Sequence, residues 1–417
     1  DNVMLGGYSE PALSGVAAVN QIQFVYQQLL LALGDGLVIF CSQYWGKRQT
    51  EPMRKISSVA MRAGLFIAVV LFAAVSLFPQ RAVGLFTTEE SIIREGTAYL
   101  GIVKYTYVFF AVTIILLATL RSVETVKIAF WLSVMAFCVN CCINYVLIYG
   151  RFGAPELGAK GAAIGTLAAR IAECAVLLVY IAKKEKKLHL QLKDYFRADR
   201  LMAGDYFRVC LPMLVVQGLW GLNTALQTVI LGHMSAAAIA ANSAASTLFL
   251  LVKSMSVGAS STASVIVGKT IGTGNIPLVK HYSSIMQRMF VVIGLVSGLL
   301  LFLIRIPVMT LYDLSPEAME MMNTFLIILS VVCVGMSYQM PTNNGIIRGG
   351  GNAMFVVKMD LVSIWMIVIP LSFAMAFVVK ASPAVVVCCL NADQIFKCVP
   401  AFLESHYGNW IRKLTRE

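Results

Sequence analysis

Long stretches without a charged residue recur along the chain, and they constrain its fold more than any other feature. A membrane-spanning helix needs roughly 20 consecutive, mostly apolar residues. Such stretches lie at Pro11–Gly34, Ala63–Pro79, Tyr105–Leu120, Ile128–Gly150, Val209–Gly232, Met289–Ile304, Asn323–Ile347 and Leu361–Val379. Three others carry one or two charges, namely Gly161–Ile181, Ser235–Gly268 and Ala381–Phe402. With a truncated first helix at Asp1–Leu5, the sequence predicts twelve spans.

Composition supports this interpretation. Of the 417 residues, 59% are hydrophobic and 13% are charged, against roughly 25% charged in an ordinary soluble protein. This excludes a soluble enzyme, a disordered chain and a nucleic-acid-binding protein. The expected fold class is an all-α polytopic membrane protein, in contact with the lipid bilayer.

Lysine and arginine concentrate in alternate connections, among them residues 46–55, the long segment 183–208 and the tail 410–417. By the positive-inside rule these connections and the C-terminus are predicted to be cytoplasmic. The net charge of +12 then follows from topology and from contact with an anionic inner leaflet, so no nucleic-acid partner is required.

The two halves of the chain repeat each other at a shift of 226 residues. Ser9 pairs with Ser235, Gly46 with Gly272, and Arg62 with Arg288; one inserted residue later, Arg121 meets Arg348. We therefore expect an N-terminal lobe at 1–182, a basic linker at 183–208 and a C-terminal lobe at 209–417. Two six-helix bundles related by a pseudo-two-fold axis along the membrane normal are a transporter design, with the substrate path between them.

Motifs for other chemistry are weak. Ala263–Thr270 matches a loose phosphate-loop pattern, but its interior is Val-Ile-Val at the end of a predicted span instead of a glycine-rich turn after a strand. No zinc-protease HExxH or nucleophile-elbow GxSxG sequence occurs. We expect no enzyme activity, no nucleotide and no cofactor.

Polar side chains inside the predicted spans are the candidate site, because they are costly in lipid. They are Asp35, Asn20 and Gln27 on the second span, Asn140 and Asn144 on the fifth, Thr166 on the sixth, and Gln217 and Asn223 on the seventh. Ordinary interhelical hydrogen bonds explain the presence of any one of these amides about as well as a binding site does.

Asp35 has three candidate roles: a substrate attractor, one half of an inner gate, or an acceptor of structural hydrogen bonds.

The segments DNVMLGG, SQYWGKRQTEPMRK, NCCINYVLIYG, GAPELGAKGAAIGT and RGGGNAMF together resemble the multidrug and toxic compound extrusion (MATE) family over essentially the whole chain. The resemblance implies a monomeric, multi-pass protein of the cell membrane that expels organic cations and drugs by antiport with H⁺ or Na⁺. It also implies that Asp1, Asn140, Asn144 and Thr166 form the H⁺ or Na⁺ site.

The sequence departs from the family pattern at Asn144, where an Asp is usual. A single carboxylate, Asp1, favours H⁺ over Na⁺ as the coupling ion. A lipid-linked oligosaccharide flippase of the same superfamily is the alternative, kept open by Lys104, Arg170 and Lys253. An intramembrane enzyme would need a nucleophile or metal cluster, and none is visible.

Overall fold

The computed structural model describes residues 4–5, 9–87, 89–188, 199–232, 234–310 and 315–415. Within these ranges the chain is almost entirely helical, and the one β-type pairing is an isolated bridge between Gly351 and Ile411. Nine of the described helices are long and apolar enough to cross a membrane, and a bent pair makes a tenth span. The prediction of an all-α polytopic membrane protein is confirmed.

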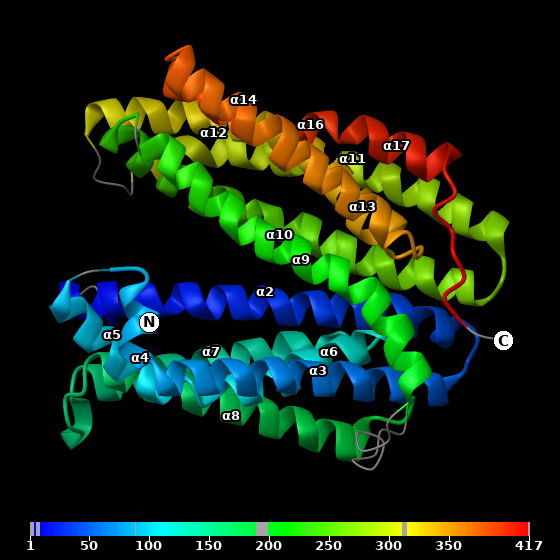
Figure 1. The fold of residues 1–417 in the computed structure, drawn as a ribbon, viewed down its shortest axis with the longest axis horizontal. Coiled ribbons are helices and arrows are strands. Elements are labelled where there is room, and N and C mark those ends of the chain that lie inside the picture. The colour runs from blue at the N-terminus through cyan, green and yellow to red at the C-terminus, as the bar shows by residue number, and fades with distance from the viewer. Residues whose placement is uncertain are drawn as a thin grey trace. The chain divides into compact units, whose positions relative to one another are not determined.

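The chain divides into two compact units, one of residues 1–37 and 50–207 and the other of residues 38–49 and 208–417. In the first half the helices are α2 (Glu10–Gly46), α3 (Thr50–Leu77), α4 (Pro79–Gly84), α5 (Glu90–Val103), α6 (Thr106–Ser122), α7 (Lys127–Ile148), the 3₁₀ turn η1 (Arg151–Gly153) and α8 (Ala159–Lys184). Within the first unit α7 packs on α8, α3 on α6, and α5 on α8 (Figure 1).

The second half begins with three long helices, α9 (Arg200–Gly232), α10 (Ala236–Gly272) and α11 (Ile276–Met309). Its later spans are divided into α12 (Pro316–Met340), η3 (Pro341–Ile347), α13 (Ala353–Asp360), η4 (Leu361–Val368), α14 (Ile369–Phe373), η5 (Ala374–Val378), α15 (Pro383–Leu390), α16 (Asp393–Phe396) and α17 (Cys398–Tyr407). The elements η3, η4 and η5 are π-helical. Helices α10, α11 and α12 pack together around an apolar core.

The helix boundaries confirm the internal repeat. Helix α10 begins and ends 226 residues after α2, and α11, α12 and α13 begin 226 residues after α3, α5 and α7. The extra residue that brings Arg121 into register with Arg348 lies beside the π-helical segment η3. A π-helical turn bonds residue i to i+5 and so accommodates an added residue without ending the helix.

One span begins earlier than the sequence predicts. Helices α5 and α6 are long and apolar enough to cross a membrane when taken together, with a bend of 55° between Val103 and Thr106. The charge of Lys104 ends the uncharged run at this bend, which is why the sequence pattern places the start of the span at Tyr105. The ammonium group of Lys104 lies over the rings of Phe72 and Tyr105, at 5.4 and 5.5 Å from their centroids.

The last turns of α2 belong to the second unit because the tail of the chain and α10 hold them. The side chain of Gln43 donates to the Arg412 carbonyl at 3.1 Å and accepts from the Leu414 N–H at 2.8 Å. Next to it, a Cβ atom on Gly46 would overlap the Lys269 carbonyl oxygen and lie 2.9 Å from the Gly272 Cα atom. A helix that is continuous in sequence therefore contributes to both units.

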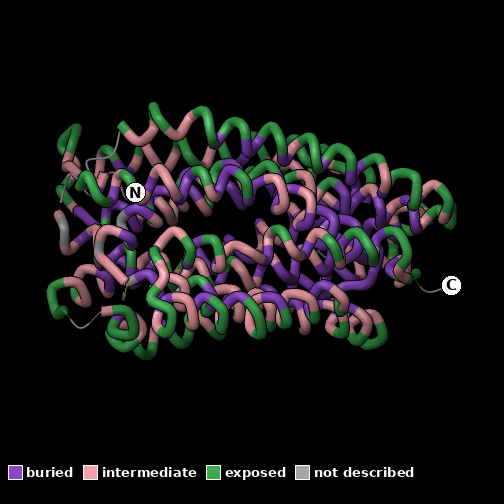
Figure 2. The backbone as a smooth tube through the Cα atoms, turned by 90° about the horizontal axis from the view of Figure 1, so that it is seen from above, coloured by how far each residue is buried: buried purple, intermediate pink, exposed green. Residues whose placement is uncertain are grey.

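Burial follows the pattern expected of helices that turn one face to lipid and one to the protein. Buried and exposed positions alternate along the helices (Figure 2). Large apolar side chains are exposed on the outer faces, including Phe66, Trp131, Phe137 and Met366. In water such surfaces would be unstable, whereas hydrocarbon solvates them without cost.

Candidate ion- and substrate-binding site

Three of the predicted site residues lie together inside the first unit. The Asn144 side-chain amide donates to Asn140 Oδ1 at 3.1 Å, and the Asn140 amide donates to Thr166 Oγ1 at 3.3 Å. Asn140 and Asn144 lie one turn apart on α7, as their spacing predicts, and Thr166 lies on the facing helix α8. Asn144 is 0% exposed. The structure thus brings together a continuous chain of amide and hydroxyl groups.

Small residues on α8 make this approach possible. A Cβ atom on Gly165 would overlap Asn144 Oδ1, and one on Gly161 would lie 2.7 Å from the Leu147 carbonyl oxygen. The segment Gly158–Thr166 therefore packs closely against α7 through its small residues. Glycine is required here because the neighbouring helix occupies the space of a side chain.

Two further groups of the first unit adjoin this chain of polar side chains, and sequence reasoning did not assign them to the site. The hydroxyl of Tyr99 on α5 lies within hydrogen-bonding reach of Thr166. One turn beyond Thr166, Arg170 forms an ion pair with the buried Glu173 at 2.7 Å, and its guanidinium carbon lies 4.7 Å from the Phe110 ring centroid. The sequence does signal Arg170 and Glu173, because opposite charges three residues apart are unusual in an apolar span. It contains no comparable signal for Tyr99.

Asp35 has a basic partner within its own unit. Arg121 on α6 donates to Asp35 Oδ1 at 2.9 Å, and each side chain is 28% exposed. The sequence left three roles open for Asp35, and the structure shows that its carboxylate has a basic partner. Arg121 lies in the last turn of α6, and its proximity to Asp35, 86 positions away, is one that no periodicity reveals.

The remaining predicted residues do not join the Asn140–Asn144–Thr166 group in the described structure. Asn20 is half-buried and Gln27 is exposed on α2. On α9 Gln217 is half-buried and Asn223 is buried, and the Asn223 Oδ1 atom has no hydrogen-bond partner among the described residues. Asp1 lies outside the described residues. No group of three or more His, Cys, Asp or Glu side chains suited to a metal ion occurs in the part of the chain that the structure describes.

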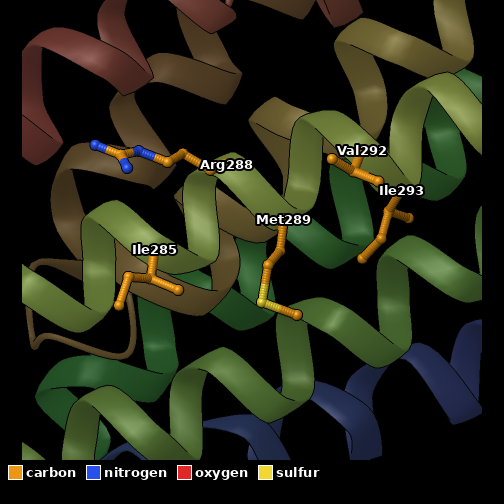
Figure 3. Close-up of a pocket in the computed structure, with 5 residues that line it drawn as sticks. All are labelled: Ile285, Arg288, Met289, Val292 and Ile293. Atoms are coloured by element: carbon orange, nitrogen blue, oxygen red, sulfur yellow. The ribbon is translucent and has the colours of Figure 1, made fainter.

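One groove of about 370 Å³ lies on the surface of α11 and is lined by Ile285, Arg288, Met289, Val292 and Ile293 (Figure 3). Its apolar lining and the exposure of four of these side chains identify it as part of the lipid-facing surface. It contains none of the predicted site residues.

The profile of the MatE family matches residues 1–146 and 212–374, which is most of the chain. The chain belongs to the MatE family. The family match confirms the resemblance carried by the sequence motifs and, together with the spans, identifies a multi-pass membrane transport protein.

Proteins similar in sequence or fold to this MatE protein are also named as transporters or multidrug resistance proteins. It is 24% identical over 424 residues to the probable multidrug resistance protein NorM of Thermotoga maritima, covering 100% of this chain and 90% of that one. It is 23% identical over 380 residues to the uncharacterized transporter YisQ of Bacillus subtilis, with coverage of 89% and 82%. The fold is that of the eukaryotic MATE transporter AtDTX14, with a TM-score of 0.83 at 18% identity, covering 98% of this chain and 90% of that one.

Proposed function

We propose that the protein is a secondary active exporter that exchanges organic cations for protons by alternating access of its two lobes. The observation that carries the choice of ion is Asn144. It is a fully buried neutral amide, bonded to Asn140, at the position where the family pattern has a second carboxylate. With Asp1 as its one acid, the site holds at most one negative charge.

Na⁺ and H⁺ require different groups in a binding site. Sites for hard cations gain affinity with the number of charged oxygen ligands. The oxygens that the Asn140–Asn144–Thr166 group supplies are neutral, and two of them, Asn140 Oδ1 and Thr166 Oγ1, already accept a hydrogen bond within it. A proton needs no shell of oxygen ligands, because it binds to a single carboxylate and neutralises it.

The test is transport by the purified protein in proteoliposomes under an imposed pH gradient or an imposed Na⁺ gradient. We expect accumulation of a fluorescent organic cation under the pH gradient alone. The matched variant is Asn144→Asp, which restores the second carboxylate and is expected to add a Na⁺-dependent component. Saturable Na⁺-driven transport by the wild type at constant pH, abolished by Asn144→Ala, would refute proton coupling.

For substrate contact we propose the amides Asn20 and Gln27 of the first lobe and Gln217 and Asn223 of the second. Amide oxygens attract a cationic group without trapping it in an ion pair. Substitution of each by Ala is expected to raise KM for a cationic dye more than it lowers the maximal rate.

The cationic side chains that would favour a flippase are engaged with aromatic rings instead. Lys104, Arg170 and Lys253 lie at 4.7 to 5.5 Å from ring centroids, a geometry that stabilises a cation locally. This arrangement supports cation export over recognition of an anionic lipid-linked sugar.

We further propose that the basic connections and the C-terminus are cytoplasmic and that the transporter acts as a monomer. A cysteine at Arg48 should react with a membrane-impermeant thiol reagent only in inverted vesicles, and one at Arg151 only in right-side-out cells. The reverse pattern would refute this orientation.

A further inference from the structure

The second unit contains a buried charged group that the proposed coupling site does not include. The ammonium group of Lys397 lies 2.8 Å from Asp360 Oδ1 and 2.9 Å from Asp393 Oδ2. The side chains are 4% exposed for Lys397, 7% for Asp393 and 24% for Asp360. Asp393 lies four residues before Lys397 in the same span, whereas Asp360 ends α13 in the preceding span.

A relay of amides extends from this group into α12. Gln394 donates to Asp393 Oδ2 at 2.8 Å, Gln339 donates to Gln394 Oε1 at 2.8 Å, and Asn343 donates to Gln339 Oε1 at 3.0 Å. Asn343 is 1% exposed, and its Oδ1 atom has no hydrogen-bond partner among the described residues. The relay therefore ends on an acceptor that can bind one more hydrogen-bond donor.

The backbone is irregular at Asn343 and around Asp393 and Lys397, and it becomes irregular directly after Asp360. The π-helix η4 begins directly after Asp360, the π-helix η3 contains Asn343, and the last span is broken into α15, α16 and α17 around Asp393 and Lys397. Irregular helices inside a membrane protein are tolerated where they are buried or line a cavity, and π-segments are frequent at functional sites. Discontinuous helices are a recurring support for ion sites in transporters.

Lys397 can keep one partner while it loses the other. If Asp360 takes up a proton, its charge disappears, and the ammonium group retains Asp393 in the same span. The link that is lost is the one between α13 and the last span. Because η4 follows Asp360 at once and packs on α16 (Figure 1), α13 would then be free to tilt relative to the last span.

Other charged and titratable groups around the site favour Asp360 as the proton acceptor. Lys253 on α10 lies near Asp393 and Lys397, so a second basic side chain faces the Asp393 side of the group. The thiol of Cys398 points to the carbonyls of Gly335 and Gln394. On α12 the Tyr338 hydroxyl donates to Gln287 and thus points away from the carboxylates, and on α17 Glu404 accepts from Asn352.

We propose that Asp360 is a proton-exchange site of the second lobe, and that its protonation releases Lys397 and uncouples α13 from the last span. This inference rests on the proposed proton coupling and adds a second titrating group to it. A merely structural ion pair would stay charged on both sides throughout the transport cycle.

The test is infrared difference spectroscopy of the purified full chain between alkaline and acidic pH, which detects the carbonyl band of a protonated carboxyl group. We expect the wild type and the matched control Asp393→Asn to gain a band that Asp360→Asn lacks. Lys397→Gln removes the ammonium that keeps the carboxylates ionised, so its band should appear at a less acidic pH. If Asp360→Asn does not fold, Asp360→Glu should shift the position of the same band.

Transport assays distinguish an error in the role of Asp360 from an error in the proposed proton coupling. Asp360→Asn should lose uptake driven by a pH gradient and keep dye exchange at equal pH, which moves no net proton. An unchanged band and unchanged gradient response in Asp360→Asn would overturn the role of Asp360 alone. Wild-type protein that shows no gradient-driven uptake would overturn proton coupling itself, whereas the infrared result would still decide whether Asp360 titrates.

Discussion

The contact between Gly165 and Asn144 gives the sharpest prediction for the first lobe. In Gly165→Ala the new methyl group would overlap Asn144 Oδ1, lie 3.0 Å from Asn144 Cγ and lie 3.5 Å from the Asn140 carbonyl oxygen. The amide must therefore turn away or the helices must separate. Either response breaks the geometry that joins Asn144 to Asn140.

The expected change in stability follows from three terms. Overpacking a buried site costs about 1–3 kcal/mol, and loss of the amide hydrogen bond costs about 1 kcal/mol. Replacing glycine by alanine within a helix returns about 1 kcal/mol. The free energy of unfolding should therefore fall by about 1–3 kcal/mol, a moderate loss, while gradient-driven transport should fall strongly because the proposed coupling site is displaced.

The control is Gly101→Ala on α5 in the same unit, where no atom lies within 4 Å of the added methyl group. It should be as stable as the wild type or slightly more stable, with unchanged transport. Thermal unfolding in detergent and transport in proteoliposomes are measured for both variants. If Gly165→Ala behaves like Gly101→Ala in both assays, the close approach of α7 and α8 does not constrain the site.

Three further changes test other parts of the molecule. Trp410→Ala removes a buried indole that donates to the Ser405 carbonyl, so thermal unfolding should show a loss of about 3–5 kcal/mol. Asp199 has a pKa below its ordinary value of 3.8, chiefly because its carboxylate accepts a hydrogen bond from the Met202 N–H. Ionised Asp199 therefore stabilises the fold above pH 3.8, and this stabilisation is lost as the pH falls through the lowered pKa. Acid unfolding of Asp199→Asn should lack that component. Asp35→Asn should reduce cation export and cost no more than about 1 kcal/mol, since its partner Arg121 is partly solvated; unchanged export and pH dependence would leave Asp35 a packing residue.

The sequence was sufficient for the features that depend on local pattern. Uncharged runs located the spans, and the ungapped repeat located the starts of α10, α11, α12 and α13 from those of their counterparts. The spacing of Asn140 and Asn144 placed both amides on one face of α7, because 3.6 residues make a helical turn. The family pattern then supplied Thr166, which the structure brings to the same place.

The features that depend on the packing of distant spans could not be predicted in this way. Asp360 and Lys397 are 37 positions apart. The sequence shows Lys397 only as a charge inside an apolar run, and Asp360 only as the charge before one. Whether such a charge faces lipid, water or a partner depends on the rotation of two helices about their axes. The division of α2 between the two units could not be predicted for the same reason, because it depends on contacts between Gln43 and the distant C-terminal tail.

The duplicated halves carry their polar groups on equivalent helices but at different positions along them. Counted from the matching starts of α7 and α13, Asp360 corresponds to the exposed Val134, which lies six residues before Asn140 on α7. The two polar positions are thus offset by six residues, or roughly 9 Å of helix at 1.5 Å per residue. A duplication that had preserved one ancestral site in both halves would keep polar residues in register. The first half instead has neutral amides on a regular helix, and the second has a charged cluster on irregular helices. The two polar groups should therefore respond independently to substitution, and Asn144→Ala should leave the infrared band assigned to Asp360 unchanged.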